Sequence, residues 1–104
     1  MRKKSKIDIQ ENMSFTRESS VEHAKNDLAE RLKIDAAHVA ENGVTDREFP
    51  DMSLGAPEKD EMAAQMISSG WQISLEAEGK TYEYRADKYQ LRLHNFEGAN
   101  YVIK

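Results

Sequence analysis

The sequence predicts an α+β domain in which one N-terminal helix packs on a small antiparallel β-meander. Two observations support this class. Apolar residues recur at helical spacing over residues 19–33, and they alternate with polar residues over most of 71–103. Alternation predicts strands with one buried face, and the short turns between them favour antiparallel neighbours. The 104 residues suit a single domain. We expect a flexible polar tail over 1–18 and one domain over 19–104.

The predicted helix covers residues 19–33. Four apolar side chains recur three or four positions apart and therefore share one face: Val21, Ala24, Leu28 and Leu32. The run from Ser19 to Glu22 is typical of a capping box, which predicts that the helix begins there. Asp35 is placed to cap a second, short turn over residues 36–38.

The strands are predicted over five segments, namely 44–49, 71–77, 81–86, 89–94 and 101–103. Asn42-Gly43 predicts a turn before the first of them. Alternation assigns a set of side chains to the core, namely Trp71, Ile73, Leu75, Ala77, Tyr82, Tyr84, Ala86, Tyr89, Leu91 and Leu93. The opposite face, with Glu83 and Arg85, is expected to lie in water.

Composition narrows the classes of function. The formal net charge of -4 argues against the basic surface of a nucleic-acid-binding domain. No run of about 20 apolar residues could span a membrane, and no apolar run follows the basic N-terminus as in a signal peptide. The chain has no cysteine, which favours a reducing compartment. We therefore expect a cytoplasmic protein that binds neither nucleic acid nor membrane.

Residue patterns indicate neither a cofactor nor a metal site. The histidines His23, His38 and His94 are not at ligand spacing, and the chain has no glycine-rich phosphate loop. Asp51, Ser53 and Gly55 imitate the start of a calcium loop, but the pattern fails after them, so local turn formation explains them better. We expect a protein that is not an enzyme. An enzyme acting through Asp51, Ser53 and a histidine is the less favoured alternative.

Residues 50–61 are predicted to form a loop, because Pro50, Gly55 and Pro57 fall close together. A loop of this length is either functional or loose in a compact domain. The prolines limit the conformational freedom that docking would remove, which favours a recognition loop.

The segment from Phe49 to Pro57 resembles the signature W-P-D-x-S-L-G-C-P of a family of small, mostly uncharacterised bacterial and archaeal domains. The similarity extends over about residues 20–95 and includes Ala64-Gln65-Met66-Ile67 and the run from Tyr82 to Asp87. Phe49 stands where the family often has tryptophan. Ala56 stands where it has cysteine, and a second family cysteine near the C-terminus is missing. The resemblance implies that this loop packs beside the last strands, with packing in place of a crosslink.

We expect a non-catalytic protein- or peptide-binding module that uses the 50–62 loop or a sheet edge. The candidate contact residues are Asp51, Met52, Ser53, Leu54 and Gly55. Alternatively, Met52 and Leu54 fill the core and the signature serves folding. The helix-plus-hairpin layout is also loosely similar to the PepSY domain, which implies peptidase inhibition as a second function. A free strand edge allows a monomer or a weak homodimer.

Overall fold

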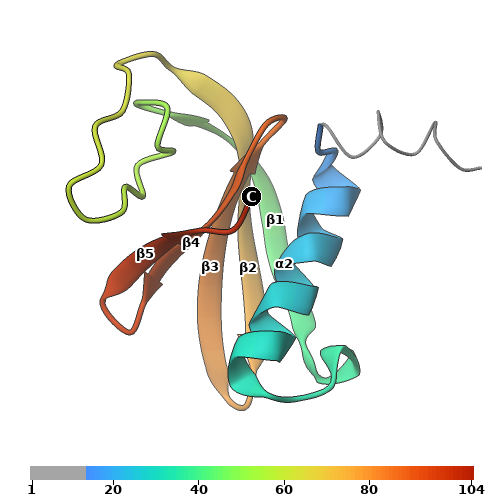
Figure 1. The fold of residues 1–104 in the computed structure, drawn as a ribbon. Helices are drawn as coiled ribbons and strands as arrows, with labels where there is room; N and C mark the ends of the chain where they lie inside the picture. The colour runs from blue at the N-terminus through green and yellow to red at the C-terminus, as the bar shows by residue number, and fades with distance from the viewer. Residues whose placement is uncertain (1–13) are drawn as a thin grey trace, which may run out of the picture.

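A computed structural model describes residues 14–104 and confirms the predicted α+β class. One helix is followed by a five-stranded antiparallel sheet whose strands lie in chain order (Figure 1). The elements are α2 (Arg17–Leu32), the 3-10 helix η1 (Ala36–His38), β1 (Ala40–Phe49), β2 (Ser68–Ala77), β3 (Lys80–Asp87), β4 (Leu91–Phe96) and β5 (Ala99–Val102). Residues 1–13, most of the predicted tail, lie outside the described residues. No helix within 14–104 is long and apolar enough to cross a bilayer.

Helix α2 begins two residues earlier than predicted, so the capping box proposed at Ser19 and Glu22 is wrong. The N-cap is Thr16, whose hydroxyl accepts from the backbone N–H of Ser19 at 3.0 Å. The Ser19 hydroxyl in turn accepts from the backbone N–H of Thr16 at 2.9 Å. Thr16 thus satisfies the free donors one turn before the predicted start. The predicted cap of η1 is confirmed, because Asp35 accepts from the backbone N–H of Ala37.

The main core lies between α2 and one face of the sheet (Figure 1). Its buried members include Ala24 and Leu28 from α2 and Ile73, Leu75, Tyr84, Ala86, Leu91 and Leu93 from the strands. The phenol of Tyr84 donates to Asp27 at 2.7 Å, and burial raises the pKa of this phenol. Placing Tyr89 in the core is wrong, since its side chain is 71% exposed. It lies in the β3–β4 turn, where its backbone N–H donates to Asp87.

Strand β1 is longer than predicted, and the expected turn at Asn42-Gly43 is wrong. The strand runs through this pair with a register shift between Glu41 and Gly43. Such a bulge absorbs one extra residue without ending the strand. The Asn42 side chain donates to the Ser74 hydroxyl at 3.1 Å across the pair. Because β1 is first in the sheet order, it has a paired neighbour on one side only.

Part of the second face of the sheet is covered by residues 50–67, which we call the β1–β2 segment (Figure 1). The expectation that this face lies in water is therefore wrong for Arg85, which is buried together with Asp87 and Arg92. Phe49, Leu54 and Ala56 are fully buried on the segment side. The two faces thus differ in chemistry, since the helix face is apolar and the segment face combines apolar groups with buried charges.

Candidate functional site

Two buried arginines hold the β1–β2 segment against the sheet. Arg85 Nη1 donates to the carbonyl oxygens of Leu54 at 3.0 Å and Gly55 at 3.1 Å. Arg92 Nη1 donates to the carbonyl oxygen of Ala56 at 3.2 Å. A buried guanidinium has several donors to satisfy, and three consecutive carbonyls satisfy part of that need. The arginines therefore fix the backbone of this segment through contacts that its own side chains do not provide.

A forked ion pair fastens the segment further along the chain. Arg92 donates from Nη1 and Nη2 to the two carboxylate oxygens of Glu61, at 2.6 and 2.7 Å. These bonds from Arg92, followed by one from the backbone N–H of Glu58, lower the pKa of Glu61 to about 2. The segment also reaches β5, because Asn100 donates to the carbonyl oxygen of Pro57 and Glu58 accepts from the backbone N–H of Val102. This contact with the last strand agrees with what the family resemblance implied.

The five predicted contact residues lie together in the first turn of the β1–β2 segment. The carboxylate of Asp51 accepts from the hydroxyl of Ser53 and from the backbone N–H groups of Ser53 and Gly55. The Ser53 bond is the main cause that lowers the pKa of Asp51. Leu54 is 0% exposed and Ser53 1% exposed, whereas Met52 and Gly55 are half-buried. A partner could therefore contact Leu54 only if the segment left the sheet.

The residues of the alternative enzyme do not converge. Ser53 donates to Asp51, and no histidine side chain in the described part of the chain hydrogen-bonds to either residue. His23 lies on α2, His38 ends η1 and His94 lies on β4. Within residues 14–104, no group of three or more histidine, aspartate or glutamate side chains could hold a metal ion.

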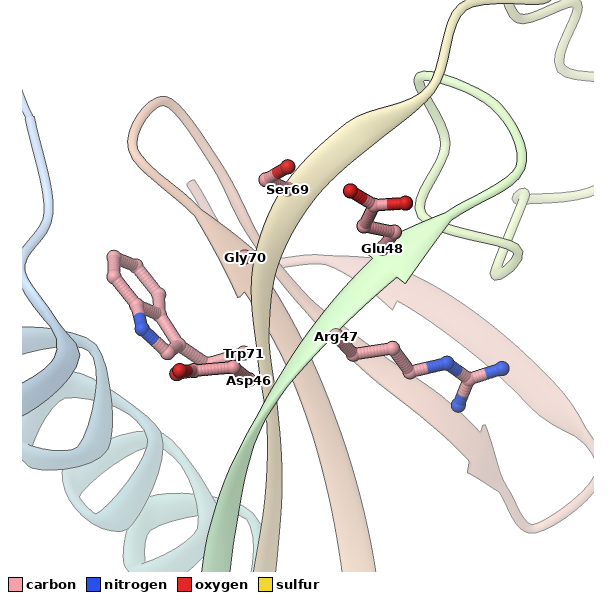
Figure 2. A pocket seen from close by; sticks show the side chains of 6 residues that line it. All are labelled: Asp46, Arg47, Glu48, Ser69, Gly70 and Trp71. Atoms are coloured by element: carbon pink, nitrogen blue, oxygen red, sulfur yellow. The ribbon is translucent and has the colours of Figure 1, made fainter.

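An open depression lies beside the C-terminal half of β1. It has a volume of about 480 Å³ and is lined by Asp46, Arg47, Glu48, Ser69, Gly70 and Trp71 (Figure 2). Figure 2 shows the side chains of Asp46 and Trp71 on the side of the sheet that faces α2, while Arg47 points to the other side. The depression therefore lies at the edge of the sheet, with a carboxylate on the side that faces α2 and a guanidinium on the opposite side.

The strand register explains this grouping. Asp46 lies opposite Trp71 and Glu48 lies opposite Ser69 in the β1–β2 pair, and opposed residues share a face. Gly70 lies between them on β2, where an added Cβ would come within 2.0 Å of the carbonyl oxygen of Ala86. Only glycine allows β2 and β3 to approach at this point.

Sequence reasoning did not select any of these depression residues as a site. Trp71 was assigned to the core, and it does pack partly against it. Asp46, Arg47 and Glu48 are consecutive charged residues, and charged side chains are typical of strand edges. That charge pattern was the available signal.

The fold and this site together define a small helix-and-meander domain with an open strand edge. The chain belongs to a family described as a domain of unknown function, DUF8738, whose model matches residues 21–94. The match begins within α2, covers strands β1 to β3 with the β1–β2 segment, and reaches into β4. Searches among curated proteins and among solved structures gave no match.

Proposed function

We propose that this domain is a non-catalytic binding module that receives an extended segment of a protein or peptide at the free edge of β1. The observation that carries the proposal is the open depression beside a strand that is paired on one side only. Alternate residues of an edge strand direct their backbone N–H and C=O groups away from the sheet. An added strand satisfies these groups, and the side chains beside them provide specificity.

The available part of the edge is residues 45–49. The guanidinium of Arg17 already donates to the carbonyl oxygen of Val44 at 2.9 Å. Residues of α2 and Glu41 surround a smaller hollow beside the first half of β1. Helix α2 therefore flanks that half, whereas the second half borders the larger depression.

The other two candidate surfaces are less suited to this role. Strand β5 has only 4 residues, and the backbone N–H of Val102 is already bonded to Glu58. The signature-like turn of the β1–β2 segment has Leu54 buried beneath it. This burial disfavours that turn as a recognition loop, and it equally disfavours peptidase inhibition of the kind suggested by the PepSY likeness, in which the turn would enter an active site.

The test selects ligands for the full chain from a displayed library of random peptides and maps the bound peptide by amide hydrogen exchange. If the peptide pairs with the edge of β1, alternate amides within 45–49 should be protected from exchange, because only the outward-facing N–H groups gain a partner. Protection confined to residues 58–67 would place the contact on the β1–β2 segment and contradict the proposal. Failure to enrich any peptide would contradict it as well.

A further inference from the structure

We propose that the segment received at this edge carries a lysine or arginine, whose cationic end lies over Trp71 beside the carboxylates of Asp46 and Glu48. The inference rests on the proposed function, because it names the chemistry of the partner at the same edge. It goes further by selecting one class of extended segment, those with a basic side chain on the face toward α2.

Within residues 14–104, no cationic side chain pairs with the carboxylates of the depression. Asp46 and Glu48 are two positions apart on one strand, so they share a face, and both are exposed. Neither forms an ion pair with any residue of 14–104. Arg47 lies between them in sequence but points to the opposite face, where it donates to Gln72 and lies 5.3 Å from the ring centre of Phe49.

The second cation near this edge is also engaged elsewhere. Arg17 donates to the carbonyl oxygen of Val44 and forms no ion pair with Asp46. Two carboxylates on one face, neither paired with a cation of residues 14–104, therefore favour a positive ligand group there. This complementarity supplies selectivity as well as affinity. Because the carboxylates are exposed, added salt should weaken the attraction.

Trp71 gives the cation a second point of contact. Its indole lines the depression on the same side as Asp46, while part of it packs against the core, which restrains the ring (Figure 2). The face of an indole attracts a guanidinium or ammonium group more strongly than any other aromatic side chain does. A carboxylate pair beside a fixed indole therefore favours a cation over a neutral apolar group of equal length.

The position of Trp71 sets the length of the side chain. Neighbouring strands lie about 4.8 Å apart, so a residue on an added strand must reach across β1 to approach β2. Lysine and arginine have long apolar stems that can lie across a strand while the charged end reaches beyond it. Shorter side chains would end over β1, and acidic ones would be repelled by Asp46 and Glu48.

The test uses short capped peptides that alternate threonine with lysine, norleucine or glutamate. Norleucine keeps the length of lysine without its charge. Binding to the full chain is followed by the fluorescence of Trp71, the only tryptophan in the sequence, and by amide exchange. We expect the lysine peptide to bind roughly tenfold more tightly than the norleucine peptide and the glutamate peptide to bind most weakly.

Two double variants test whether the preference for lysine over norleucine depends on the carboxylates of the depression. Asp46→Asn with Glu48→Gln should remove most of the advantage of lysine over norleucine. Glu30→Gln with Glu76→Gln removes the same charge from exposed positions in the last turn of α2 and the far end of β2, and should preserve that advantage.

Two results would overturn the inference in distinguishable ways. Equal binding of all three peptides, with alternate amides of 45–49 protected, would leave the peptide-binding edge intact and refute the cation preference. Absence of protection by every peptide, including any selected from the random library, would remove the edge function together with the inference that rests on it.

Discussion

Replacing Leu54 by alanine tests whether the β1–β2 segment belongs to the folded core. The side chain is 0% exposed. The substitution removes three carbon groups at roughly 0.8 kcal/mol each, about 2.4 kcal/mol of lost burial. The cavity left behind adds a variable amount, so we expect the free energy of unfolding to fall by about 2–5 kcal/mol. Leu54 has a φ of 59°, and alanine carries the same left-handed backbone strain, so strain cancels from the comparison.

Met62→Ala is the matched control, because Met62 lies in the same segment and is 95% exposed. Its substitution should change the free energy of unfolding by less than about 0.5 kcal/mol. Thermal unfolding followed by circular dichroism measures both variants. A loss of 2 kcal/mol corresponds to at least about 8 °C in a domain of this size. If Leu54→Ala were as mild as the control, Leu54 would not contribute to the core, and its turn would remain a candidate contact surface beside the β1 edge.

Three further changes test individual contacts. Hydrogen bonds from Arg92 and from the backbone N–H of Glu58 lower the pKa of Glu61 from 4.5 to about 2. The ionised Glu61 therefore stabilises the fold above pH 4.5, and this contribution is lost as the pH falls toward 2. The free energy of unfolding should fall less steeply over that range in Glu61→Gln, and parallel curves would contradict the pairing. Gly70→Ala should cost about 2 kcal/mol or more in denaturant unfolding, since its Cβ would meet the carbonyl oxygen of Ala86, and a neutral result would refute the close strand approach. Thr16→Ala should cost about 1 kcal/mol, whereas an unchanged stability would show that α2 does not depend on this cap.

The helix and the meander were predictable because their patterns are local. Residues at helical spacing, such as Ala24 and Leu28, are buried against the sheet, and alternation over Ile73 and Leu75 correctly gave the inner face of β2. The predicted helix start and the predicted turn were wrong for local reasons. Thr16 is the N-cap instead of Ser19, and a bulge allows β1 to continue through Asn42-Gly43.

The cover on the second face could not be predicted from alternation. Arg85 occupies a polar position in the alternating pattern of β3. The same pattern would be found if that face of the strand were exposed to solvent. The burial of Arg85 depends on the carbonyl oxygens of Leu54 and Gly55, which are about thirty residues away in the chain. The family resemblance implied a packed loop, but the buried arginines that hold it carry no local signal in the sequence.

The candidate edge site also depends on contacts between segments that are distant in the sequence, so it could not be predicted from local patterns. Asp46 and Glu48 are exposed charges on an edge strand, and such charges ordinarily discourage pairing with another chain. Here they lie beside Trp71, which only the β1–β2 register brings opposite Asp46. Asp46 and Glu48 would repel the same carboxylates of a second copy of this edge. They would attract the basic side chains of another strand at the same spacing. One set of side chains can therefore prevent self-association and select a partner, and the lysine, norleucine and glutamate peptides separate these effects.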